Sequence, residues 1–383
     1  MFVFLSKIDY SYRGNLNRKE GIDELKRLAV FLGGIVLILS VLFGTKLVLN
    51  AQSENKDTTG SNTLVIFNWG EYIDPELMKA FEKETGYHII YSTFDSNEAM
   101  QSKIKQGGTR YDLVFPSESA VPKMLEENLL LPIDHSQIKG LENISPYLLD
   151  NKFDPKNQYT IPYFWGTIGI MVNQKNSEAN KITKWADLWN PAFENDILMV
   201  DGARESIGFA LQSTNQSLNE KNADTVAQSV KQMETLQPNV KAVLTDEIKT
   251  LMINNDAPIG IGYSGDAAFV MSENPDVRYV VPEDGSAIWT DNFAIPKTAQ
   301  NFEGAYAFIN FMLRPENAKQ NAEYVGYATP NEKAKAMLPE ELTADESFYP
   351  SIETIEKMEH YEYLGKETVE MYNDLFLAWK MGL

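Results

Sequence analysis

The chain contains no cysteine in 383 residues and only three histidines. The lack of cysteine excludes disulfide bonds, thiolate metal ligands and a thiol-linked lipid anchor. The histidines (His88, His135 and His360) are too scattered to indicate a metal site, which needs clustered ligands. Neither a Walker A motif nor a glycine-rich dinucleotide fingerprint is present. The sequence therefore predicts no metal and no cofactor, and nothing in these absences favours an enzyme.

Basic residues are also scarce. The chain has 34 Lys and Arg against 54 Asp and Glu, a formal net charge of −20. Such a deficit argues against nucleic acid or an anionic lipid surface as a partner, and it is compatible with cationic ligands.

The N-terminal part of the chain holds its one long apolar run, residues 28–45, preceded by Lys26 and Arg27. The run is long enough to cross a bilayer, and the basic pair places its N-terminal side inside the cell. We therefore predict a membrane anchor at 28–50, with a cleaved signal peptide as the alternative. Residues 51–62 are polar and predict a tether, while residues 1–27 are either cytoplasmic or precede the true translation start.

Beyond the tether, short apolar runs alternate with amphipathic stretches. This alternation predicts an α/β fold with parallel strands. Asp74, Pro75 and Gly86 are typical of the cap, first turn and end of a helix. Extended runs near 165–172 and 289–295 are expected to cross between two α/β domains as a hinge, leaving a cleft. Predicted strands are 64–67, 88–91, 112–115, 197–200, 242–244, 259–263, 278–281 and 287–295, and predicted helices are 97–106, 122–128, 223–236, 247–254, 304–313, 316–324 and 366–381.

Two distant segments each combine a tryptophan with a carboxylate: Trp69 with Glu71, and Trp289 with Asp291. An aromatic face attracts a cation, and a carboxylate accepts its N–H groups. Residues 68–72, 116–119, 201–205 and 263–266 all follow predicted strands. In open α/β sheets, ligands bind beyond the carboxyl ends of strands. These segments are therefore expected to share one ligand site.

Residues 63–350 resemble the spermidine/putrescine-binding proteins of ABC importers, of the Gram-positive type. The resemblance implies the two-lobed periplasmic binding protein fold, type II, with lobe 1 at 63–167 and 290–335 and lobe 2 at 168–289 and 336–383. The stretches that carry it are NWGEYIDPEL (68–77), YSTFDSNEAM (91–100), YDLVFPS (111–117), IPYFWGTIGIMVN (161–173), WADLW (185–189), DGARES (201–206), AIWTDNFAIP (287–296), INFMLRPENA (309–318) and GYATPN (326–331).

The resemblance also implies roles for single residues. Acids would grip ammonium groups, aromatic rings would line the methylene chain, and a serine would supply a polar contact. These residues are Glu205 and Asp291 (acids), Trp69, Tyr72, Tyr263, Trp289 and Tyr327 (aromatics) and Ser117 (polar contact), with Gly70, Glu71 and Ser119 as further candidates. Arg204 adjoins Glu205, but neighbours in an extended stretch point to opposite sides, so it is not expected to neutralise that acid.

The chain departs from the family pattern at four places. Gly70 replaces a threonine, Ser119 replaces a tyrosine and Gly202 replaces a ligand-contacting acid. Near the C-terminus, Leu377 and Ala378 stand where a glutamine contact is expected. These departures leave the choice between putrescine and spermidine open.

The function predicted from the sequence is capture of an extracellular polyamine and its delivery to an ABC permease and its ATPase. The protein would be a monomer without enzymatic activity, held at the outer face of the cell membrane or free in the periplasm. Two alternatives remain open at this point. One is binding of choline, betaine or another quaternary ammonium, and the other is an extracellular hydrolase with Glu205 and Asp291 as an acid/base pair.

Overall fold

The structure, a computed structural model, describes residues 62–346 and 348–382. Its strands are β1 Thr63–Trp69, β2 His88–Phe94, β3 Leu113–Val114, β4 Leu130–Leu131, β5 Thr160–Asn173, β6 Ile197–Val200, β7 Val240–Leu244, β8 Ile259–Tyr263, β9 Val277–Val280, β10 Ala287–Pro296 and β11 Glu359–His360. Its α-helices are α2 Pro75–Thr85, α3 Asn97–Gln106, α4 Val121–Glu126, α5 Ala203–Gln212, α6 Ala223–Glu234, α7 Glu247–Ile253, α8 Ser264–Glu273, α9 Phe302–Met312, α10 Pro315–Val325, α11 Glu332–Lys335, α12 Glu340–Thr343, α13 Ile352–Ile355 and α14 Lys366–Lys380.

The anchor predicted at 28–50 and all but the last residue of the tether lie outside the described residues. Within 62–346 and 348–382, none of the helices combines the length and the apolar character that a bilayer crossing requires.

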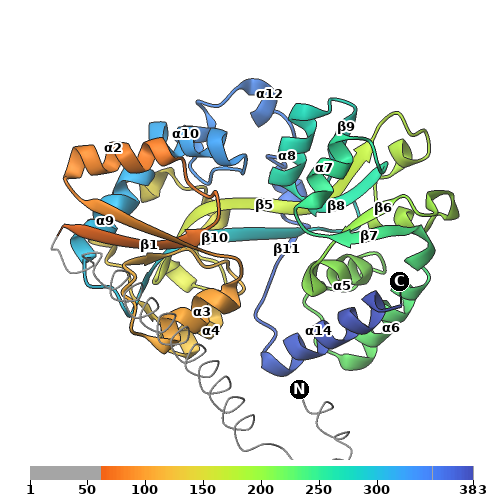
Figure 1. Cartoon of the computed structure of the whole chain (residues 1–383), viewed down its shortest axis with the longest axis horizontal. Helices are drawn as coiled ribbons and strands as arrows, with labels where there is room; N and C mark the ends of the chain where they lie inside the picture. The colour runs from red at the N-terminus through yellow and green to blue at the C-terminus, as the bar shows by residue number, and fades with distance from the viewer. Residues whose placement is uncertain (1–61, 347, 383) are drawn as a thin grey trace, which may run out of the picture. The chain divides into compact units, whose positions relative to one another are not determined.

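Eight of the strands form one path, in the order β2-β1-β3-β10-β5-β8-β6-β7, while β4 and β11 pair with β10 and β9 pairs with β5. β1 pairs in parallel with β2 and β3, and β6 pairs in parallel with β7 and β8. The long strands β5 and β10 are antiparallel to each other and run between the two groups (Figure 1). We call the part built on β1–β4 with α2, α3, α4, α9 and α10 lobe 1, and the part built on β6–β9 with α5, α6, α7, α8 and α14 lobe 2.

The prediction of a two-lobed α/β fold with extended crossings is confirmed. The strands are parallel within each half, as the alternation of strand and helix predicted, but the crossing strands make the sheet mixed. β5 and β10 are buried along their whole length. Such continuous burial agrees with the mainly apolar sequence of β5, whereas β10 also buries the polar residues Thr290, Asp291 and Asn292.

Local signals place the helix after β1 as expected. The Asp74 carboxylate accepts a hydrogen bond from the Glu76 amide at 2.8 Å, and Pro75 occupies the first helical position. Gly86 ends the helix with φ of 75°, a left-handed conformation that glycine adopts without steric cost. Asp74 is therefore a helix cap and does not contact the site described below.

Candidate functional site

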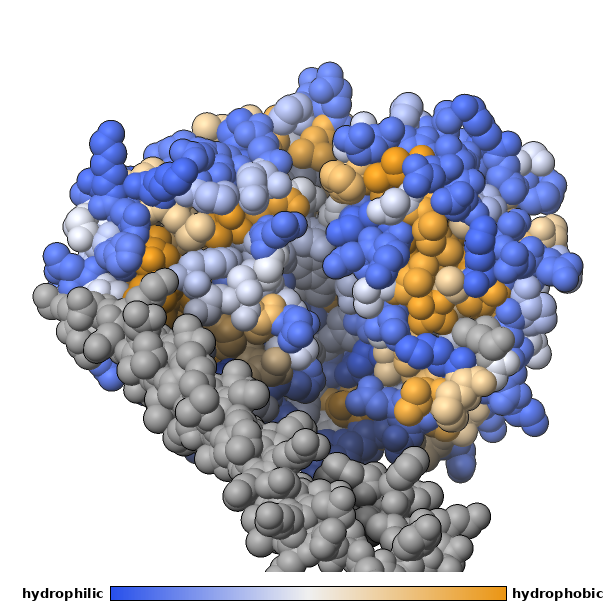
Figure 2. Space-filling model, viewed as in Figure 1, coloured by the Kyte–Doolittle hydropathy of each residue, from blue (hydrophilic) through white to orange (hydrophobic). Residues whose placement is uncertain are grey.

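A cleft of about 1640 Å³ opens between the two lobes (Figure 2). Its walls come from the residues that follow β1, β3, β6 and β8, the topological position where open α/β sheets bind ligands, and from β10. The cleft brings together all eleven residues singled out in the sequence: Trp69, Gly70, Glu71, Tyr72, Ser117, Ser119, Glu205, Tyr263, Trp289, Asp291 and Tyr327.

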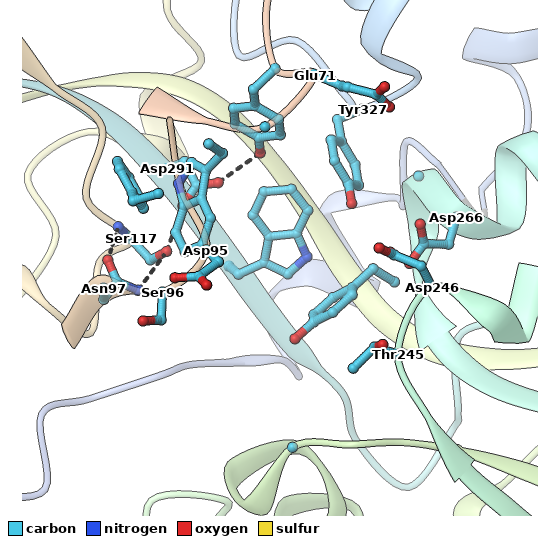
Figure 3. A pocket seen from close by; sticks show the side chains of 18 of the residues that line it. Glu71, Asp95, Ser96, Asn97, Ser117, Thr245, Asp246, Asp266, Asp291 and Tyr327 are labelled. Atoms are coloured by element: carbon cyan, nitrogen blue, oxygen red, sulfur yellow. Dashed lines mark hydrogen bonds between the residues drawn. The ribbon is translucent and has the colours of Figure 1, made fainter. Parts of the chain in front are cut away.

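Asp291 on β10 is the most firmly held acid of the cleft. The Tyr72 hydroxyl donates to its Oδ2 at 2.6 Å, and the Ser117 hydroxyl donates to its Oδ1 at 2.6 Å (Figure 3). Asn97 orients Ser117 through two contacts of 3.2 Å, one with the hydroxyl and one with the backbone amide. Only 6% of Asp291 is exposed. Burial raises the pKa of this carboxyl to about 6, against the opposing effect of its two hydrogen bonds.

The turn after β1 presents two aromatic side chains to the cleft. The Trp69 indole donates to the Phe115 carbonyl at 2.9 Å, and its ring packs 4.5 Å from that of Phe94. Glu71 has a left-handed backbone, with φ of 51°, and is exposed at the rim. This sharp turn returns the chain so that Tyr72 is buried again beside Asp291.

Aromatic rings continue across the cleft from lobe 1 to lobe 2. The Trp289 ring meets Tyr327 edge-on at 4.8 Å and Tyr263 edge-on at 6.2 Å. Tyr72 also meets Tyr327, at 5.7 Å. Gly265 makes room for this arrangement, because a Cβ there would collide with the Tyr327 ring. The result is an aromatic lining suited to a flat or slender apolar group.

Glu205 lies on the lobe 2 side, in the first turn of α5, and not in an extended stretch as the sequence suggested. Its carboxylate accepts a hydrogen bond from the Tyr263 hydroxyl at 3.0 Å. It also folds back over Gly202, where a Cβ would collide with it. The glycine that departs from the family pattern thus gives Glu205 its present position.

The expectation that Arg204 does not neutralise Glu205 holds, but for a different reason. Arg204 donates to Asn219 at 2.8 Å and to the Glu362 carbonyl at 3.1 Å, and its guanidinium lies 5.2 Å from the centre of the Tyr361 ring. The C-terminal segment therefore engages this cation, and helix geometry carries the side chain away from its neighbour.

The acids of the cleft fall into two groups. Asp201 pairs with Lys380 at 2.9 Å, and Lys249 lies 3.4 Å from Asp246 and 3.3 Å from Asp266. In contrast, none of the acids Glu118, Glu205 and Asp291 forms an ion pair within residues 62–346 and 348–382. Figure 3 shows the separation, with Asp291 on one side of the pocket and Asp246 and Asp266 on the other. Acids without counter-charges beside aromatic rings form a site for a cation.

Among the cleft residues that were not singled out in the sequence are Glu118 and Tyr361. Glu118 lies between the candidates Ser117 and Ser119, and in an extended stretch its side chain would point to the side opposite theirs. Tyr361 comes from a late segment that reaches the cleft because β11 pairs with β10. Leu377, where the sequence offers no polar contact to a ligand, lies on α14, 53% exposed and outside the cleft lining.

The described residues contain no group of three or more His, Asp or Glu side chains arranged to hold a metal ion.

Residues 76–350 match the bacterial extracellular solute-binding protein family. The chain belongs to this family. It is 38% identical to the spermidine/putrescine-binding periplasmic protein of Salmonella typhimurium, over 84% of this chain and 92% of that protein. The PotD substrate-binding protein of Streptococcus pneumoniae, solved with calcium and HEPES, shares 51% identity at a TM-score of 0.78, covering 84% of this chain and 99% of that one. The TpPotD lipoprotein of Treponema pallidum shares 28% sequence identity at a TM-score of 0.75, covering 83% of this chain and 99% of that one.

The Salmonella relative is named as a binding protein and the Streptococcus relative as the substrate-binding protein of an ABC transporter, so the prediction of a solute-binding protein and not an enzyme is confirmed. The two-lobed fold of this solute-binding protein agrees with the same comparisons.

Proposed function

We propose that this solute-binding protein captures a polyamine of the spermidine and putrescine class outside the cell and delivers it to an ABC permease. The observation that carries the proposal is Asp291: a buried carboxyl held by two hydrogen bonds, with no counter-charge and with aromatic rings around it. The names of the relatives, which mention spermidine and putrescine, agree with this ligand class.

In this proposal, the ends and the middle of the ligand are recognised separately. Asp291 accepts one ammonium group and Glu205 another, from opposite sides of the cleft. Trp69, Tyr72 and Trp289 cover the methylene chain, with Tyr263 and Tyr327 closing the aromatic lining. Ser117 holds Asp291, while Gly70, Glu71 and Ser119 contribute at the rim.

The expected affinity is in the micromolar range, which corresponds to about −8 kcal/mol. Cation–π contacts supply about 1 kcal/mol each, and burial of methylene groups about 0.8 kcal/mol each. Charge-assisted hydrogen bonds to the two acids add to this and offset the entropic cost of binding.

Closure follows from placing the two acids on different lobes. A ligand that bridges them stabilises the closed form over the open one, and the permease would recognise that form. We take the lobes to span 63–167 with 290–335 and 168–289 with 336–383. β5 and β10, which cross between them, are the elements about which they would move.

The proposal is tested by calorimetry of the purified protein with putrescine, spermidine, spermine and choline. We expect micromolar binding of at least one polyamine and much weaker binding of choline, because a quaternary ammonium has no N–H groups to donate to Asp291 and Glu205. Tight choline binding without polyamine binding would assign the cleft to quaternary ammonium compounds. Ligand that is chemically altered after incubation would indicate a hydrolase.

We further propose that residues 28–50 hold the protein, as a monomer, at the outer face of the cell membrane. The apolar run and the basic pair before it support this placement. Extraction of cell membranes with alkaline carbonate tests it. An anchored protein stays with the membrane pellet, whereas a protein released by signal cleavage appears in the supernatant, with a mature N-terminus that mass spectrometry identifies.

A further inference from the structure

Glu118 is a buried acid of the cleft that the proposed function has not used. It follows β3 directly, and only 1% of it is exposed although it lines the cleft. Its backbone amide donates to the Thr290 carbonyl at 3.0 Å, and its Oε2 accepts from the Thr290 amide at 2.7 Å. Glu118 is thus fixed to the strand residue that precedes Asp291.

The other carboxyl oxygen, Oε1, is buried and has no hydrogen-bond partner among the described residues. No Lys or Arg of the described residues pairs with the group either. A buried carboxylate with neither counter-charge nor full hydrogen bonding is costly, and such a group stays protonated. The empty cleft therefore holds Glu118 in its neutral form.

The ionisable groups around Glu118 increase this cost. Asp291 is a nearby acid that raises the pKa of Glu118, whereas backbone groups, including that of Tyr361, oppose the shift. Beyond Tyr361 lie Glu205 and the cation Arg204, and Arg204 is already engaged by the C-terminal segment.

His360, the neighbour of Tyr361 on β11, does not supply the missing positive charge. Burial lowers its pKa to about 4, so it is neutral at pH 7.

We propose that Glu118 is a third ammonium-binding acid, neutral in the empty cleft and ionised when a polyamine arrives, so that binding releases a proton. The carboxylic acid loses its proton to solvent and the resulting carboxylate faces the ligand cation, and no bond to the ligand forms. This inference rests on the proposed function. It assigns to Glu118 a preference for ligands with three cationic centres over ligands with two.

Burial raises the pKa of Glu118 to about 8, and the Thr290 amide opposes this shift only in part. At pH 7 Glu118 would be mostly protonated in the free protein, whereas Asp291, with its lower pKa, would be mostly ionised. A proton released on binding at pH 7 therefore comes mainly from Glu118.

The test is isothermal titration calorimetry of the full-length protein with spermidine at pH 7, in buffers of different ionisation enthalpy. The dependence of the observed heat on the buffer gives the number of protons released. We expect close to one proton for the natural protein and about one tenth for Glu118→Gln. Glutamine keeps the shape and the oxygen that accepts from Thr290, so a purely structural role of Glu118 is preserved in this variant.

Glu98→Gln is the matched control, since Glu98 is an exposed acid of the same cleft in the first turn of α3. We expect it to release as many protons as the natural protein. Equal proton release by the natural protein and by Glu118→Gln, with spermidine binding intact, would overturn the role of Glu118 and leave the proposed function standing. Failure of any polyamine to bind the natural protein would overturn both.

A second measurement separates ligands by charge. Glu118→Gln is expected to weaken spermidine binding by about fivefold at pH 7 and putrescine binding by less, because putrescine has only two ammonium groups for Asp291 and Glu205. An equal loss for both ligands contradicts the assignment of Glu118 to a third cationic centre.

Discussion

The two sides of the cleft hold their acids differently. On the lobe 1 side, Asp291 is 6% exposed and accepts hydrogen bonds from both Tyr72 and Ser117. On the lobe 2 side, Glu205 is only half-buried and accepts one described side-chain hydrogen bond, from Tyr263. Lobe 1 thus presents a rigid acid in a low-dielectric setting, and lobe 2 presents one that is still partly solvated.

The difference implies unequal contributions to binding. A carboxylate that is already oriented and partly desolvated loses little entropy when an ammonium group arrives, and its attraction for the cation is screened less by water. A solvated acid must give up water and rotamer freedom first. Lobe 1 is therefore expected to supply most of the affinity, and lobe 2 to supply the added contacts that favour closure.

The largest effect is expected from Asp291→Asn. Removing one partner of a desolvated charge pair costs about 2 kcal/mol or more, so spermidine affinity should fall at least about thirtyfold in calorimetry at pH 7. Asparagine is similar in shape, so the melting temperature should change little. Asp201→Asn is the control, because Asp201 already pairs with Lys380. Affinity that survives Asp291→Asn unaltered would remove this residue from the site.

The second prediction concerns pH. Asp291 must be ionised to bind an ammonium group, and its pKa is about 6. In the Glu118→Gln background, which removes the second titrating acid, lowering the pH from 7 to 5 should weaken spermidine binding about tenfold. Adding Glu205→Gln should keep this dependence, whereas adding Asp291→Asn should abolish it. A pH-independent affinity of the natural protein between 5 and 7 contradicts the role given to Asp291.

Raising the pH should strengthen ligand binding through Asp291, but it should lower the stability of the ligand-free protein through the same group. Its pKa is raised on folding, from 3.8 to about 6, so between these values the folded chain retains a proton that the unfolded chain has lost. The contribution of Asp291 to stability is therefore present below pH 3.8 and is lost as the pH rises to about 6. Thermal unfolding of the ligand-free protein and of Asp291→Asn over this range should show the difference.

Much of the fold could be predicted because its signals are local. The cap and stop at Asp74 and Gly86, and the apolar runs that became β6 and β8, need no knowledge of the rest of the chain. The helix α5 is not predicted from the sequence, because residues 201–205 read as an extended continuation of the preceding strand. The antiparallel direction of β5 and β10 depends on pairing between distant segments, which periodicity does not encode.

The residues of the site also divide into those that the sequence could predict and those that it could not. Trp69 and Asp291 could be selected from their type and their place after or within extended runs. Glu118 and Tyr361 could not, because their positions depend on contacts across long stretches of chain: Glu118 with Thr290, and the segment of Tyr361 with β10. The hydrogen bond from Arg204 to the Glu362 carbonyl in the C-terminal segment is likewise a tertiary contact.

A smaller effect is expected from Glu205→Gln. Because Glu205 is partly solvated and its one described side-chain hydrogen bond comes from Tyr263, loss of its charge should weaken spermidine binding about fivefold. Tyr263→Phe removes that hydrogen bond and keeps the charge and the ring, so it should have a weaker effect still. If Glu205→Gln costs more than Asp291→Asn, the assignment of the dominant contribution to the lobe 1 side is wrong.

The smallest effect tests the acids that are already paired. Lys249 neutralises part of the charge of Asp246 and Asp266 at the lobe 2 side of the cleft. Replacing it with glutamine makes that side more negative, so a cationic ligand should associate about twofold faster at low salt, measured by stopped-flow fluorescence of the cleft tryptophans. At about 1 M salt the Debye length is near 3 Å and the difference should vanish.

The control for this prediction is Lys139→Gln. Lys139 is exposed on the surface, and it does not line the cleft. The change alters the net charge of the protein by the same amount as Lys249→Gln, so an effect of total charge alone would accelerate both variants equally. Faster association in Lys249→Gln only, and only at low salt, locates the effect in the field of the cleft. A gain that persists at high salt would instead show that Lys249 obstructs the ligand directly, and that Asp246 and Asp266 belong with the ligand-binding acids.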